Sequence, residues 1–103
     1  MVIKVIYLEV AVQDLASIYK YISQDSVKYA KLEIQKIKAF ADAIKNQPLK
    51  GRLYQTINGV EVRSIVFRHY ILFYTFENQR VSILSIHHHV RLISNNPAVG
   101  KDE

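Results

Sequence analysis

The chain has 103 residues, half of them hydrophobic, with fourteen Lys and Arg against nine Asp and Glu and a net charge of +5. This length and composition fit one folded domain and exclude a disordered chain. Because there is no cysteine, disulfides, cysteine-ligated zinc and thiol catalysis are excluded. The positive charge indicates either a polyanionic partner (nucleic acid, the ribosome or an acidic protein) or a general solubility charge.

The sequence shows neither a membrane span nor a secretion signal. Its longest apolar run, Tyr70 to Phe76 with Thr75 inside it, is far shorter than the ~20 residues that cross a bilayer. The first residues contain no small-residue cleavage site and carry Glu9 and Asp14, which is not typical of a signal peptide. We therefore expect a cytoplasmic protein without membrane contact.

A strand and a helix are expected first. Residues 2–7 are β-branched and aromatic, which predicts a short strand. A helix is expected to open at residues 12–14, because four apolar residues then share one face at i, i+3, i+4 and i+7. These residues are Leu15, Ile18, Tyr19 and Ile22. A polar break at residues 23–26 follows, in which Asp25 or Ser26 is placed to cap the next helix.

A second helix is expected from about Val27 to Lys45, ended by Asn46 and Pro48. Its apolar residues recur at a 4-3-4-3 spacing and form a seam for packing on another helix or a sheet. The seam consists of Ala30, Ile34, Ile37, Ala41 and Ile44. The short polar link between the helices predicts an antiparallel helical hairpin.

Strands follow the helices, at residues 54–57, 60–67, 69–76 and about 80–88. Asn58-Gly59 is typical of a tight hairpin turn, because both residues tolerate positive φ. The pattern predicts one α+β domain over residues 1–94, ordered β-α-α-β-β-β-β. Its closing strands form an antiparallel meander, the first strand joins at an edge or in the middle, and the helical hairpin covers one face. The aperiodic residues 95–103 are expected to form a flexible tail.

Basic and imidazole side chains gather in the strand half, where acids are few. They are Lys50, Arg52, Arg63, Arg68, His69, His87, His88, His89 and Arg91. One interpretation is chemistry on RNA, because arginine stabilises a developing pentacoordinate phosphate and histidine moves a proton near neutral pH. The other interpretation is structural: Arg63 pairs with Glu61 on one strand face, and the remaining arginines are solvated.

The histidine triplet raises the question of a metal. On an extended strand His87 and His89 share one face while His88 points the other way. No third ligand stands at metal-ligand spacing, apart from distant His69 or a carboxylate. We therefore expect no metal and no other cofactor. One histidine is expected to be buried and the others to line a polar surface.

Several ordered anchors are shared with a known group of proteins. They are Asp14-Leu15, Ala30, residues 48–52, Val62-Arg63, residues 70–74 and residues 83–91. In this order and spacing the chain resembles the RelE/ParE superfamily of bacterial toxins from type II toxin–antitoxin modules, over residues 3 to 92. The resemblance implies the same element order. It also implies a hetero-oligomer with a cognate acidic antitoxin, whose partly disordered segment folds on binding. The stripe Leu15, Ile18, Tyr19 and Ile22 is the expected antitoxin-binding surface.

The RelE-like branch cleaves mRNA on the ribosome without a metal. For a member of that branch the resemblance implies that Arg63 contacts the scissile phosphate, that His88 or His89 is the acid, and that Arg52 and Lys50 supply the basic group after the helices. Two departures count against it. Gln47 stands where some of these ribonucleases have a glutamate base, and it cannot take a proton at neutral pH. The C-terminal tyrosine that serves as an acid in such ribonucleases is also absent, and Val90 follows the histidines.

The ParE-like branch poisons DNA gyrase and needs no catalytic residue of its own. His88 followed three residues later by Arg91 is typical of it, although Leu92 replaces the aspartate that often follows. We therefore expect a ParE-like gyrase inhibitor that binds its target through Arg63, His88 and Arg91. A ribosome-dependent mRNA endoribonuclease is the alternative, and a non-toxic, antitoxin-binding relative is a further one.

Overall fold

The computed structural model describes residues 2–88; His89, Arg91 and the expected tail at 95–103 lie outside the described residues. The elements are β1 (Lys4–Tyr7), α1 (Glu9–Ser23), α2 (Val27–Ala43), a short 3-10 helix η1 (Ile44–Asn46), β2 (Arg52–Ile57), β3 (Val60–Phe67), β4 (Tyr70–Glu77) and β5 (Arg80–His88). The expected α+β order is confirmed. Neither α1 nor α2 is long and apolar enough to cross a membrane.

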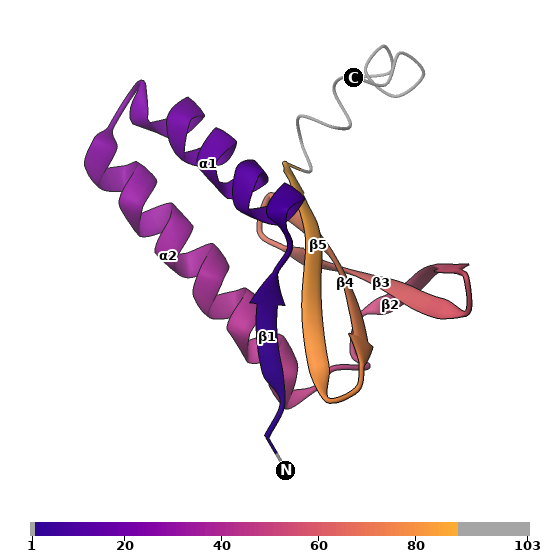
Figure 1. Ribbon diagram of the computed structural model, residues 1–103. Helices are drawn as coiled ribbons and strands as arrows, with labels where there is room; N and C mark the ends of the chain where they lie inside the picture. Colours follow the sequence, from indigo (N-terminus) through magenta and orange to yellow (C-terminus); the bar gives the residue numbers. More distant parts are fainter. Residues whose placement is uncertain (1, 89–103) are drawn as a thin grey trace.

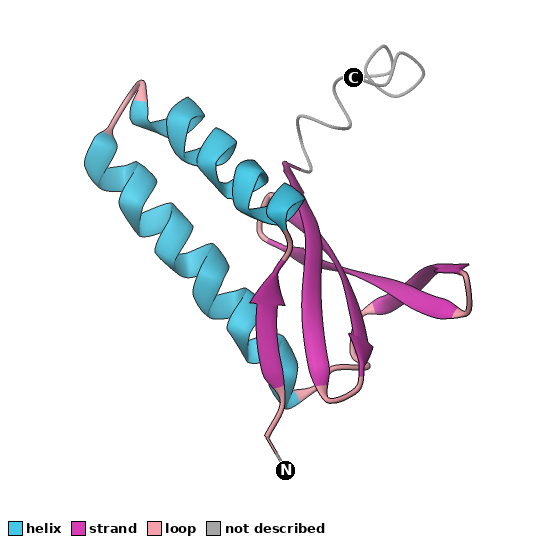
Figure 2. Cartoon of the chain, viewed as in Figure 1, coloured by secondary structure: helices cyan, strands magenta, loops and turns pink. Residues whose placement is uncertain are grey.

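The strands form one sheet in the order β1-β5-β4-β3-β2. β2 to β5 are the expected antiparallel meander. β1 lies at an edge and runs parallel to β5, from Lys4 opposite Arg80 to Tyr7 opposite Ile83, so the sheet is mixed. The two helices lie side by side over one face (Figure 1). Figure 2 shows the β2–β3 hairpin extending away from this helical layer.

The core fills the space between the helical hairpin and the sheet. The expected seam, whose last residue Ile44 lies in η1 and not in α2, is buried except at Ile34, which is half-buried. On the sheet, the buried apolar side chains that meet the helices are Tyr70, Leu72, Tyr74, Val81, Ile83 and Ile86. The expected cap is confirmed, because the Ser26 hydroxyl accepts the Tyr29 N–H at 3.1 Å. Local sequence signals thus place α2 and its packing face correctly.

The expected start of the first helix at residues 12–14 was wrong, because α1 begins at Glu9. Leu8 holds the N-cap position without a side-chain hydrogen bond, and its N–H donates to the Ile83 carbonyl at 3.0 Å. The contact with β5, rather than a polar cap, therefore positions the first turn. Asp14 consequently lies inside α1, where its Oδ2 accepts the Ile86 N–H at 2.9 Å.

The parallel pairing of β1 with β5 stops at Ile83, and beyond it the Asp14 carboxylate accepts a backbone N–H of β5 in place of a strand. Asp14→Ala should lower the free energy of unfolding by about 1–3 kcal/mol, because the Ile86 N–H loses its acceptor in a partly buried position. Asp14→Asn keeps an acceptor oxygen and should lose less. Urea unfolding of both variants measures the difference, and equal losses would contradict this role of the carboxylate.

Candidate functional site

Residues 47–51, between η1 and β2, form what we call the clamped loop, because side chains of the sheet hold it. The hydroxyl of fully buried Tyr74 donates to the Pro48 carbonyl at 2.8 Å and accepts the Gly51 N–H at 2.9 Å. Burial raises the pKa of Tyr74, while the Gly51 hydrogen bond and the charge of Arg63 act in the opposite direction. The hydroxyl therefore keeps its proton at neutral pH and serves as donor and acceptor at once.

Arg63 provides the second hold on the clamped loop. Its Nη1 donates to the Gly51 carbonyl at 2.8 Å and to the Leu49 carbonyl at 3.4 Å. Its Nη2 donates to Glu61 Oε1 at 3.1 Å, so the expected pairing with Glu61 is confirmed. The side chain is 17% exposed. The guanidinium thus supports the loop from beneath and is engaged by protein oxygens.

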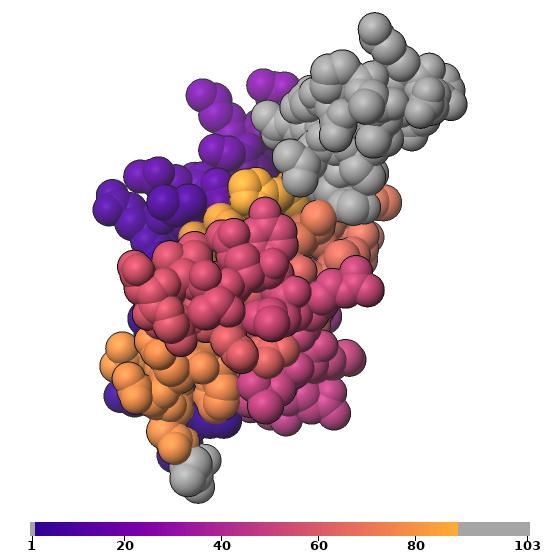
Figure 3. All heavy atoms as spheres, turned by 90° about the vertical axis from the view of Figure 1, so that its right-hand side faces the viewer, coloured from indigo at the N-terminus to yellow at the C-terminus, as the bar shows by residue number. Residues whose placement is uncertain are grey.

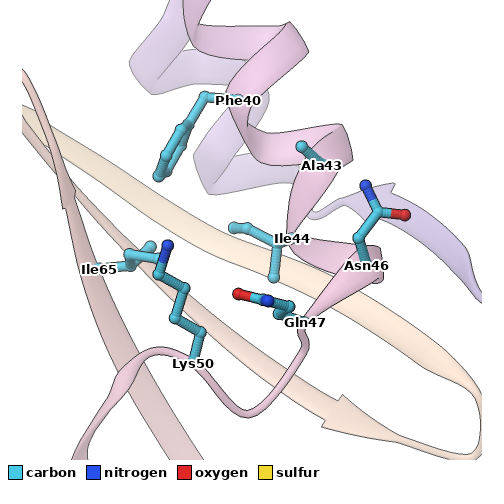
Figure 4. Close-up of a pocket in the computed structure, with 7 residues that line it drawn as sticks. All are labelled: Phe40, Ala43, Ile44, Asn46, Gln47, Lys50 and Ile65. Atoms are coloured by element: carbon cyan, nitrogen blue, oxygen red, sulfur yellow. The ribbon is translucent and has the colours of Figure 1, made fainter.

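The clamped loop presents basic and apolar side chains to the surface. Lys50 and Arg52 are exposed, as is Leu49. Lys50 lines two shallow hollows, one of about 230 Å³ that reaches under η1 and one of about 270 Å³ that includes Arg52 and Ser64. Figure 4 shows the Lys50 ammonium beside Ile65 and the Gln47 amide directed below Ile44. This surface can bind an anion or an acidic partner, but Gln47 gives it no proton-accepting base.

The described histidines lie away from Arg63. His87 pairs with Ile71, which pairs with Val66. Because strand residues alternate, His87 projects from the open face, the side of the sheet without helices, whereas Arg63 is on the helix-covered side. His88 shares the side of Arg63 but pairs through Tyr70 with Phe67, about 13 Å further along the strands at ~3.3 Å per residue.

The surroundings of the histidines are aromatic. The His87 ring is 5.5 Å from Phe73, and the His88 ring is 5.3 Å from Tyr70 and 6.2 Å from His69. His87 and His88 are half-buried, and His69 is exposed. Within residues 2–88, no three His, Asp or Glu side chains are grouped so as to hold a metal ion. His89 and Arg91, two further expected site residues, lie outside the described residues.

The expected antitoxin-binding stripe is divided by the fold. Leu15 and Ile18 are both 7% exposed and pack on the sheet, while Tyr19 and Ile22 are half-buried beside them. Part of the stripe borders an open hollow of about 290 Å³ on the helical side. Its lining residues are Tyr7, Val12, Leu15, Ala16, Tyr19, Ile34 and Lys38.

A buried carboxylate was missed from the sequence. Glu33 on α2 is 2% exposed. The Tyr70 hydroxyl donates to its Oε2 at 3.3 Å, and Arg68 Nη1 lies 3.4 Å from its Oε1. Burial, followed by the charge of Glu33, raises the pKa of Tyr70 to about 12, so this hydroxyl stays a donor at neutral pH. The sequence does contain one signal for the burial of Glu33: it follows the seam residue Ala30 by three positions and so lies on the same face of the helix.

The chain is similar in sequence and in fold to toxins of type II toxin–antitoxin systems. The family described as "ParE toxin of type II toxin-antitoxin system, parDE" matches residues 5–93. A solved structure described as "Chromosomal ParDE TA system from P. aeruginosa" contains a chain of the same fold, with a TM-score of 0.66 and 17% sequence identity. The match covers 84% of this chain and 95% of that one. No curated protein sequence matches.

Proposed function

The chain belongs to the ParE toxin family of type II toxin–antitoxin systems, and we propose that it inhibits DNA gyrase and is neutralised by a cognate acidic antitoxin. The placement of Arg63 favours gyrase over mRNA. Cleavage of RNA needs an arginine and a proton-transferring group within reach of one phosphate. Here the Arg63 donors contact loop carbonyls and Glu61, and His87 and His88 lie elsewhere on the sheet.

A gyrase inhibitor needs a binding surface rather than a catalytic group. We assign part of that surface to the clamped loop and Arg52, because Lys50 and Arg52 are exposed cations on a rigidly held segment. Arg63 then acts by holding the loop. His88 and Arg91 remain proposed contacts. Since gyrase works in the cytoplasm, the toxin acts there. When it is neutralised, it forms a hetero-oligomer with its antitoxin.

The test runs two assays on one preparation of the purified chain. Gyrase supercoiling should be inhibited and cleaved DNA should accumulate, while ribosome-bound mRNA stays intact. Cut mRNA with unaffected gyrase would replace this proposal with the endoribonuclease. Inactivity in both assays, together with tight binding of the antitoxin encoded beside the toxin, would identify a non-toxic relative.

A matched pair of double variants tests the surface. Lys50→Ala with Arg52→Ala should raise the half-inhibitory concentration for gyrase by about tenfold, the effect of losing roughly 1.4 kcal/mol of binding free energy. Lys20→Ala with Lys28→Ala removes the same charge from exposed positions of the helical hairpin and should change little. Equal effects of the two pairs would show that only net charge matters.

A further inference from the structure

β2 is an open edge of the sheet. β3 pairs with it on one side, and no described segment pairs on the other. All six residues of β2 are exposed, including Leu53, Tyr54 and Ile57 at 48–59%. Natural edge strands are usually protected by proline, charge, bulges or a covering element. β2 has a bulge between Leu53 and Gln55, but no proline, and its one charged residue stands at its start. Its last three residues therefore remain open to strand pairing.

An apolar hollow lies beside this edge. The β2–β3 hairpin faces the viewer in Figure 3, and a hollow of about 400 Å³ is lined by side chains of this hairpin and of β4 and β5. The lining residues are Tyr54, Gln55, Ile57, Val62, Phe73, Leu84, Ser85 and His87. The Tyr54 and Phe73 rings meet edge to face at 4.9 Å. An added strand would pair with the backbone of β2 and place alternate apolar side chains toward this hollow.

The charges near β2 indicate the chemistry of its partner. Lys50 and Arg52 lie at its start, and the neighbouring acid, Glu61, is already paired with Arg63. A second copy would bring the same basic edge and another net charge of +5, so like charges would oppose a β2–β2 pair. An apolar segment with carboxylates meets both the hollow and the cations.

We propose that β2 binds an extended, apolar and acidic peptide segment that adds to the sheet as a further strand. The assignment of this segment to the antitoxin rests on the proposed function. Strand addition would also fill the hollow against the open face. The side chains of the added strand that face the hollow would thereby cover part of the open face.

The turn before β3 determines which backbone groups point outward. Both residues of the 58–59 turn have positive φ, as a type I′ turn requires. Ile57 and Val60 close this turn as a hydrogen-bonded pair, so Thr56 and Glu61 form the next, non-hydrogen-bonded pair. The Thr56 N–H and C=O therefore point away from β3, toward an added strand.

Thr56→Pro is the decisive variant, with Thr56→Ala as its control. Proline removes the outward N–H and is tolerated on the solvent side of an edge strand, whereas alanine keeps the N–H. Calorimetry with the full-length antitoxin encoded beside the toxin should show binding weakened about tenfold for proline and little for alanine. Urea unfolding checks that both variants fold. In the unaltered toxin, antitoxin should slow hydrogen exchange of the Thr56 amide.

The outcomes separate this proposal from the function on which it rests. Full-strength antitoxin binding by Thr56→Pro, without protection of the Thr56 amide in the unaltered toxin, would overturn strand addition and leave the partner standing. Failure of the unaltered toxin to bind would overturn the antitoxin partner, and this proposal with it. Self-association of the toxin that protects the same amide would assign the edge to a second copy and overturn the peptide.

Discussion

Gly51→Ala should lower the free energy of unfolding by about 2–4 kcal/mol, because the clamped loop leaves no room for a β-carbon. Such an atom would lie 2.5 Å from the Tyr74 hydroxyl oxygen and 2.7 Å and 2.9 Å from two ring carbons. Tyr74 is fully buried in a close-packed core and cannot move aside cheaply. The substitution therefore also breaks the hydrogen bonds that join Tyr74 to Pro48 and Gly51.

Gly59→Ala is the matched control in urea unfolding, because it makes the same chemical change in open space. Gly59 has a φ of +81°, and a β-carbon added there would meet no atom of the described residues within 4 Å. Only backbone strain of about 1 kcal/mol is therefore added. Tyr74→Phe removes the hydroxyl and should partly rescue Gly51→Ala, which a double-mutant cycle measures. A Gly51→Ala variant no less stable than Gly59→Ala would contradict the clamp.

The fold was largely predictable wherever neighbouring residues decide the structure. The Ser26 cap, the α2 seam and the 58–59 turn each depend on side chains or φ values within a few positions. The start of α1 depends instead on the bond from Leu8 to Ile83 across the fold. The parallel pairing of β1 is equally remote, which is why the sequence left its place in the sheet open.

The candidate site shows the same division. The Arg63–Glu61 pair lies two residues apart on one strand and was predictable from alternation. The hydrogen bonds that hold the clamped loop are not local in sequence. Gly51 lies twelve residues before Arg63 and twenty-three before Tyr74. The sequence alone is compatible with two placements of Arg63: exposed on a phosphate-binding face, or hydrogen-bonded beneath a loop. Only the register of β3 and β4 distinguishes them.

Arg68→Ala should be far more destabilising than loss of an ordinary turn residue, by about 2–3 kcal/mol. Removing one partner of a buried ion pair costs about 3–5 kcal/mol, and the 37% exposure of Arg68 reduces this through solvent screening. The Glu33 carboxylate would keep the Tyr70 hydrogen bond on Oε2 but lose the cation at Oε1. That oxygen has no hydrogen-bond donor among the described residues.

Backbone strain and charge can be separated at this position, because Arg68 has a φ of +57°. Arg68→Gly loses the same charge but relieves strain, so it should be about 1 kcal/mol more stable than Arg68→Ala. Adding Glu33→Gln should restore part of the stability of Arg68→Ala, since no buried charge then remains uncompensated. Urea unfolding of these variants and of Glu33→Gln alone at neutral pH measures both effects. If adding Glu33→Gln gives no rescue, the loss of stability in Arg68→Ala does not come from the uncompensated charge of the buried Glu33 carboxylate.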